Sequence, residues 1–150
     1  QFIEWDYKKE LDWFLLDFDR HRQMQSFVKE LNKFYLKNKT LYEIDFSWEG
    51  FSWIANDDKD QSVIAFKRMD KDNNELIVVC NFVPMERNSY LIGVEKGAYQ
   101  TVFSTDWVNF GGETKVSKKK IESKAVSMHG YDNSVSLTLP PLSVTYLKKI

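Results

Sequence analysis

The sequence predicts a mainly β protein, an antiparallel β-sandwich preceded by one amphipathic helix. Three observations predict this class: apolar residues recur at helical spacing before residue 46, they follow a period of two in short segments after it, and Gly, Pro, Asn and Asp occupy the breaks between those segments. Short strands without intervening helices are typical of antiparallel sandwiches and barrels. With 150 residues, of which 43% are hydrophobic, the chain is long enough to form a folded core.

The helix is predicted over residues 20–37. Asp17 or Asp19 is expected to cap its N-terminus, and the basic residues at 37 and 39 suit its C-terminal end. Residues 1–16 are compatible with a loop or with short helical turns. One apolar stripe runs along the helix and predicts that this side packs on other structure, either the sandwich or a part of a longer protein; it consists of Met24, Phe27, Val28, Leu31, Phe34 and Tyr35.

The strands are predicted at residues 51–55, 62–68, 75–82, 90–95, 98–104, 121–127, 134–139 and 143–148. Residues 76–80 are apolar throughout, which predicts a central strand buried on both faces. Segment 51–55 lies between Gly50 and a polar stretch, so we expect it near a sheet edge, with Phe51, Trp53 and Ala55 on one face. The residues expected to contribute to the interior are Val63, Phe66, Val78, Cys80 and Leu137.

Composition narrows the classes of function. The net charge of −1 gives no reason to expect binding to nucleic acid or to an anionic membrane, and the apolar runs are too short to span a bilayer. The single cysteine, Cys80, excludes an intramolecular disulfide and suits a reducing compartment, so we expect a cytoplasmic protein. Because residue 1 is glutamine and not methionine, we expect Gln1 to be a boundary within a longer chain.

The sequence contains no motif for a metal or a cofactor, and we expect neither. His21 and His129 have no second ligand at metal-binding spacing. Asp70, Asp72 and Asn74 resemble the start of an EF-hand loop, but Glu75 stands where that loop requires glycine, so a polar turn explains them better.

No complete active site is predicted either. A glycosidase needs two converging carboxyl groups, whereas the six acidic residues between positions 4 and 19 are typical of a solvated segment. The basic run KVSKKK at residues 115–120 could grip phosphates, although such a run is more often a solvated loop.

Aromatic residues are the remaining candidates for a site, at 15% of the chain with five tryptophans. Flat rings stack on the apolar faces of sugar rings while neighbouring polar groups bind hydroxyls. Trp53, with Asn56 and Asp57 close by in the sequence, is the candidate glucan-binding group. The alternative is that Trp53 is part of the core, since tryptophan is highly buried on average.

Several phrases of this sequence resemble the C-terminal portion of 1,4-alpha-glucan branching enzymes, members of the amylase-type glycoside hydrolase superfamily; they include LNKFYLKNKTLYEIDFSWEGFSWIANDD, SVIAFKR and SLTLPPLS. The resemblance implies that residues 1–45 are the end of a catalytic (β/α)8 barrel, truncated here, with the predicted helix as its closing helix. It implies that residues 46–150 are a C-terminal all-β domain. Glu4 and Trp5 would then lie near the rim of the active site.

The family reaction cleaves α-1,4-glucan and transfers the released segment to a 6-hydroxyl group, which creates an α-1,6 branch. Its catalytic carboxylates belong to barrel motifs that are absent from these residues, so the resemblance implies no catalytic residue and no activity in this chain alone. The partner it implies is an α-glucan such as glycogen or amylose. A helix without its barrel is also expected to self-associate through its apolar stripe. Two alternatives remain: a stand-alone carbohydrate-binding sandwich, and the tail of a related amylase-family hydrolase.

Overall fold

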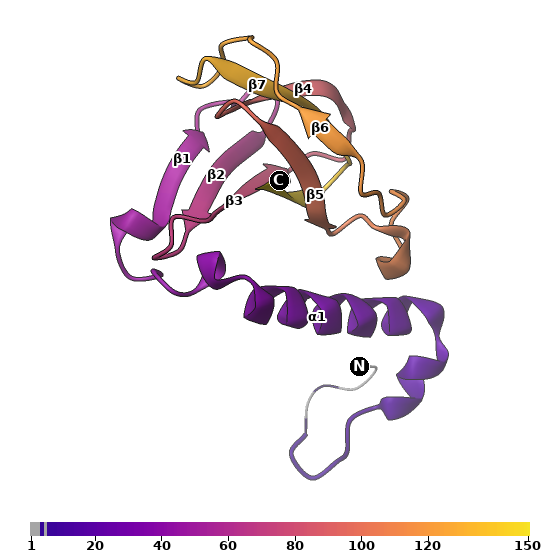
Figure 1. Cartoon of the computed structure of the whole chain (residues 1–150). Helices are drawn as coiled ribbons and strands as arrows, with labels where there is room; N and C mark the ends of the chain where they lie inside the picture. The colour runs from indigo at the N-terminus through magenta and orange to yellow at the C-terminus, as the bar shows by residue number, and fades with distance from the viewer. Residues whose placement is uncertain (1–3, 5) are drawn as a thin grey trace.

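A computed structural model describes Glu4 and residues 6–150 of the chain, and within these residues one α-helix precedes eight β-strands (Figure 1). The helix α1 spans Asp19–Lys37. The strands are β1 (Phe51–Ala55), β2 (Val63–Met69), β3 (Glu75–Asn81), β4 (Arg87–Val94), β5 (Ala98–Ser104), β6 (Lys120–Glu122), β7 (Asn133–Leu139) and β8 (Ser143–Lys149). Short 3-10 helices lie at η1 (Trp13–Asp17), η2 (Lys39–Leu41), η3 (Trp48–Gly50) and η4 (Val108–Phe110).

The strands form two antiparallel sheets, which confirms the predicted sandwich. The larger sheet has the order β1-β2-β3-β8-β5-β6, and β4 pairs with β7 in the smaller one. Strand β3 lies between β2 and β8 and is buried at every residue after Glu75, as its uninterrupted apolar run predicts. Strand β1 is an edge strand, which confirms the expectation drawn from its flanking residues.

One predicted strand, at residues 121–127, is wrong. Strand β6 ends at Glu122, and its ladder with β5 stops there. Two residues later, the backbone N–H and C=O of Lys124 both bond to Ser134 of β7, at 2.9 and 3.0 Å. The segment therefore passes from one sheet to the other, and its backbone groups are satisfied by two different partners instead of one continuous ladder.

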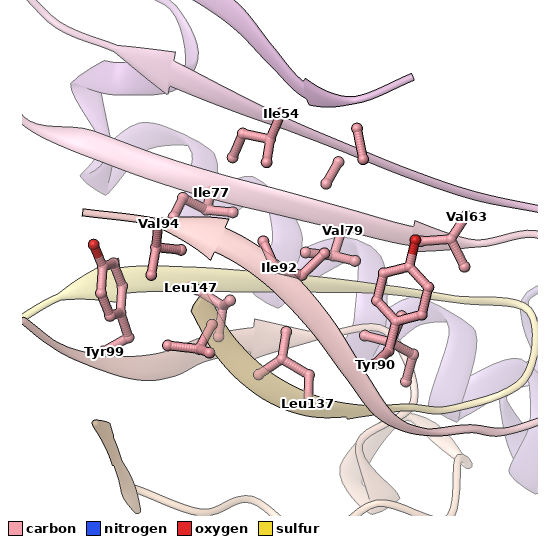
Figure 2. Close-up of a cluster of buried hydrophobic side chains, with 14 residues drawn as sticks. Ile54, Val63, Ile77, Val79, Tyr90, Ile92, Val94, Tyr99, Leu137 and Leu147 are labelled. Carbon is pink, nitrogen blue, oxygen red and sulfur yellow. The ribbon is translucent and has the colours of Figure 1, made fainter. Parts of the chain in front are cut away.

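The main core lies between the two sheets, where side chains from both converge (Figure 2). Val63 and Leu137 belong to it, as predicted. Val78 and Cys80 are also buried, but on the opposite face of the larger sheet, since Ile77 and Val79 take the inward positions of β3. The expectation for Phe66 is wrong: it is only half-buried, because it lies on this outer face near the sheet edge.

Helix α1 covers that outer face of the larger sheet (Figure 1). The ring of Phe34 lies 4.9 Å from that of Phe103 and 5.2 Å from that of Tyr146, and the ring of Phe27 lies 5.5 Å from that of Phe110. Only part of the predicted stripe therefore packs on the sheet side, at Phe27 and Phe34. Met24 remains 61% exposed, on the side of the helix where η1 lies. In the described part of the chain, the structure has no helix whose length and apolar character would let it cross a membrane.

The two ends of α1 differ in how their backbone N–H and C=O groups are capped. Phe18 occupies the N-cap and forms no side-chain capping bond, so the prediction that Asp17 or Asp19 caps the helix is wrong. Asp19 instead lies in the first turn, where its negative charge interacts favourably with the positive N-terminal end of the helix dipole. At the other end, the side-chain amide of Asn38 donates to the carbonyl oxygen of Phe34 at 2.6 Å, which satisfies an otherwise free carbonyl.

Candidate functional site

A recess with aromatic walls lies beside the edge strand β1. It has a volume of about 550 Å³, and we call it the aromatic recess; its lining residues are Asp45, Phe46, Ser47, Trp48, Phe51, Trp53 and Arg68. Phe46 and Trp48 are almost fully exposed, and Trp53 is 48% exposed. Exposed aromatic side chains gathered around one recess are a typical feature of a binding surface. Trp53 is therefore not part of the core.

Two phenylalanine rings hold the indole of Trp53 in place. The ring of Phe51 lies 4.9 Å away at 90°, and that of Phe66, on the neighbouring strand β2, lies 5.9 Å away at 82°. Such edge-to-face contacts fix the orientation of the indole, and Trp53 is nevertheless 48% exposed. The expectation that Ala55 shares this face is wrong, because a register shift between Trp53 and Ala55 turns Ala55 into the core.

The segment before β1 brings Phe46 and Trp48 to the same place. Gly50, at the end of η3, lies so close to Ile44 that a Cβ atom on Gly50 would be 1.9 Å from the Ile44 carbonyl oxygen. Only glycine permits this approach. The chain can therefore fold back tightly and present both aromatic side chains beside the edge strand.

Polar groups complete the recess. The guanidinium of Arg68 donates to Asp45 at 2.5 Å and, more weakly, to the carbonyl oxygen of Leu41 at 3.4 Å. Arg68 is largely buried while Asp45 is half-exposed, so the carboxylate is held in place and still faces solvent. Nearby, a hydrogen bond with the hydroxyl of Ser47 lowers the pKa of Glu49. The recess thus combines flat apolar faces with groups that can bind hydroxyls, as sugar-binding surfaces do.

The residues predicted for the site are not all at the recess. Asn56 and Asp57 are exposed just after β1, but neither lines it. Their neighbour Asp58 does not line the recess either, and it accepts a hydrogen bond from the hydroxyl of Tyr90 at 2.5 Å. Asp45, Ser47 and Arg68 take the positions beside the aromatic rings. The closely spaced aromatics of DFSWEGFSW could have pointed to Phe46 and Trp48, whereas Arg68 is distant in sequence and gives no such signal.

The remaining predicted residues lie elsewhere. Glu4 is exposed, and Trp5 is outside the described residues. Among the described residues, no three His, Cys, Asp or Glu side chains lie close enough together to hold a metal ion. Asp70 instead closes a turn: its carboxylate accepts from the backbone N–H groups of Asp72 and Asn74 at 3.0 and 2.9 Å. Burial opposes the charge of Asp70, but these bonds and the side-chain amide of Asn74 outweigh it and lower the pKa.

Comparison with known proteins gives the family. The family described as "Alpha amylase, C-terminal all-beta domain" matches residues 53–150. The chain belongs to this family. The matched residues of this alpha-amylase C-terminal domain include β2 to β8 entirely, with Trp53 at their start. The aromatic recess therefore joins the edge of the family domain, at Trp53 and Arg68, to the segment that precedes it.

Relatives extend the likeness beyond the alpha-amylase C-terminal domain to the helix. The 1,4-alpha-glucan branching enzyme GlgB of Halothermothrix orenii is 43% identical over 100% of this chain and 24% of its own length. The enzyme of the same name from Aquifex aeolicus is 47% identical over 99% of the chain and 24% of its own length, and that of Oceanobacillus iheyensis is 40% identical over 97% and 23%. The chain thus spans about a quarter of the length of these relatives.

Proposed function

We propose that this chain is the C-terminal part of a 1,4-alpha-glucan branching enzyme. The whole protein would cleave an α-1,4-glucan and transfer the segment to a 6-hydroxyl group, forming an α-1,6 branch in cytoplasmic glycogen. The observation that carries the proposal is the identity of 40–47% along 97–100% of the chain to proteins of that name. A likeness that continues through the helix, and not only through the family domain, favours this enzyme over another amylase-type protein.

In this proposal residues 1–45 complete a catalytic barrel and residues 46–150 form the C-terminal domain. The retaining mechanism needs a carboxylate nucleophile and a carboxylic acid, both supplied by the barrel. Glu4 and Trp5 belong to the rim of that active site. The 150 residues contribute no catalytic group and have no branching activity of their own.

A chain-length assay tests the function. The full-length protein is incubated with amylose, and the product is debranched and its chains are separated by length. New side chains that appear only after debranching support a branching enzyme. New reducing ends without branch points would instead identify a related hydrolase, the second candidate. The 150-residue chain, assayed in parallel, should give neither product, and any activity above a protein-free blank would contradict the assignment.

For the domain itself we propose a binding role, in which the aromatic recess holds a segment of α-glucan away from the catalytic centre. In this role the exposed part of the Trp53 indole stacks on one glucose unit, while Asp45 and Ser47, which line the same recess, bind hydroxyls. One stacked ring contributes on the order of 1 kcal/mol, so single contacts are weak and a polymeric glucan gains from repeated ones. Asn56 and Asp57, exposed beyond the recess, would meet a chain that continues along β1. A stand-alone carbohydrate-binding sandwich would share this property but would not need a barrel.

A further inference from the structure

A second cavity is lined by residues of β5 and of the segment that joins η4 to β6. That segment lies on the right of Figure 1. The volume of the cavity is about 190 Å³. We call it the hydroxyl pocket, because six of its lining residues are serine or threonine. Strands of both sheets contribute Thr101, Thr138 and Thr145, and the joining segment contributes Lys115, Ser117 and Lys119.

Three of the four threonine hydroxyls of the pocket lack protein partners within the described residues. In the part of the chain that the structure describes, Thr101, Thr138 and Thr145 form no side-chain hydrogen bond. Thr145 is only 6% exposed. Thr138 is exposed, and neither Thr101 nor Thr145 has a fully buried, unpaired hydroxyl, so all three hydroxyls are open to a polar ligand. The pocket therefore has a place for a polar occupant.

Two serines add donors. The hydroxyl oxygen of Ser104 accepts from the backbone N–H of Asp106 at 3.3 Å, and that of Ser117 accepts from the backbone N–H of Lys119 at 3.1 Å. A hydroxyl that accepts one such bond still has its own hydrogen to donate. Each hydroxyl can donate one hydrogen bond, and Lys115 and Lys119 can only donate, so the complementary ligand is one whose exposed atoms are acceptors.

The charges around the pocket also favour a ligand that presents acceptor atoms. Lys115 and Lys119 form no ion pair within the described residues, and no carboxylate lines the pocket. Of the acidic groups nearby, Asp106 accepts from the hydroxyl of Thr114 at 2.6 Å, Glu122 pairs with Lys120 at 2.8 Å, and Glu113 is exposed outside the pocket lining. Two unpaired ammonium groups beside hydroxyl donors produce a positive potential that attracts an anion.

We propose that the hydroxyl pocket binds the phosphate group of a small molecule. A phosphate carries close to two negative charges at neutral pH, and its oxygens are strong acceptors, which matches two lysines and a set of hydroxyl donors. Trp107 lines the same pocket and supplies an apolar wall for the carbon skeleton of the ligand. This site is separate from the aromatic recess, with which it shares no lining residue.

The test is a titration of the ¹⁵N-labelled chain at constant ionic strength, with inorganic phosphate, a hexose 6-phosphate and the unphosphorylated hexose as probes. We expect saturable amide shifts at residues 101–107, 114–119 and 145 with the two phosphates and none with the hexose. Tighter binding of the hexose phosphate than of inorganic phosphate would support packing on Trp107, and equal affinities would assign the pocket to free phosphate. Absence of saturable shifts with both phosphates would overturn the proposal.

Substitutions locate the site. Lys115→Gln and Lys119→Gln should each weaken phosphate binding about tenfold, the value of one charge-assisted hydrogen bond. Lys118→Gln is the matched control, because it removes the same charge from the same segment but Lys118 does not line the pocket. Its backbone oxygen, which accepts from the side-chain amide of Gln100 at 2.6 Å, is unaffected. If Lys118→Gln weakens binding as much as the other two, the phosphate is held by general charge and the pocket assignment is wrong.

Discussion

The ring of Phe34 in α1 lies 4.9 Å from the ring of Phe103 in β5, and through this contact the helix packs on the outer face of the larger sheet. Tyr146 of β8, at 5.2 Å from Phe34, extends the contact to a second strand. Arg68 of β2 adds a bond to the segment that precedes β1, through the carboxylate of Asp45. We therefore expect the helix and the β domain to unfold together.

Phe34→Ala should lower the free energy of unfolding by about 1–3 kcal/mol, less than for a fully buried phenylalanine because this ring is only half-buried. Urea unfolding, followed by tryptophan fluorescence and by far-UV circular dichroism, measures the change. Leu36→Ala is the control on the same helix, since Leu36 is 71% exposed. Equal effects of the two substitutions would mean that the helix does not depend on Phe34 for docking.

Asp70→Ala should lower the free energy of unfolding by about 1–3 kcal/mol near neutral pH, because three donors in the turn lose their acceptor. The folded state lowers the pKa of Asp70, so the contribution of this carboxylate is present above the usual aspartate pKa and is lost as the pH falls through the lowered value. The difference between wild type and variant should therefore be constant from about pH 5 to 8 and shrink below about pH 4.

Chemical denaturation at several pH values checks this dependence. Asp72→Ala in the same turn is the control, because Asp72 is exposed and takes part in the turn through its backbone N–H. A difference between wild type and Asp70→Ala that stays unchanged down to pH 2 would contradict the role assigned to the carboxylate.

Cys80 should resist a thiol reagent in the folded protein. It is 8% exposed, and burial raises the pKa of its thiol, so both access and thiolate content are low. We expect slow reaction with Ellman's reagent under native conditions and complete reaction in 6 M guanidinium chloride, a concentration chosen to exceed the midpoint of about 5 M that defines hyperstable proteins. Rapid native labelling would contradict the burial of Cys80 on the outer face of the larger sheet.

Trp53→Ala should abolish or strongly reduce the retardation of the chain in a glycogen-containing native gel. Trp13→Ala is the matched control, because Trp13 is 60% exposed but lies outside the aromatic recess. Thermal melts of both variants separate binding from stability. Lost retardation at an unchanged melting temperature supports the recess as a glucan site. A large drop in melting temperature would mean that Trp53 is mainly structural, and the binding role would fail at this residue.

The chain should self-associate at high concentration through the side of α1 that faces away from the sheet. Met24 and Val28 are 61% and 45% exposed there and line a recess together with Trp13. Apolar patches of this kind promote association. Sedimentation velocity should show a concentration-dependent increase in mass that Met24→Lys reduces and that Leu36→Lys, outside this recess, leaves unchanged. A strict monomer at all concentrations would contradict the prediction.

Much of the fold could be predicted because the positions of its helix and strands follow from local patterns of apolar and polar residues. The apolar run of β3 predicted a central strand, and the polar residues around β1 predicted an edge. The helix was predicted from its stripe to within one residue of its observed start. Sequence reasoning failed where the partner of a segment changes, as at Lys124, because a strand pattern does not say which sheet a backbone group will bond.

The candidate site shows the same division. The sequence by itself determined that Trp53 lies on an edge strand, since alternation and turn residues act over a few neighbouring positions. Only the tertiary structure decided that Asp45, Ser47 and Arg68 surround it in place of Asn56 and Asp57. It also decided that Phe66 supports the indole from the next strand and that Ala55 turns inward. These outcomes depend on strand register and on the close approach of Gly50 to Ile44, and both are set by packing between residues that are not neighbours in the sequence.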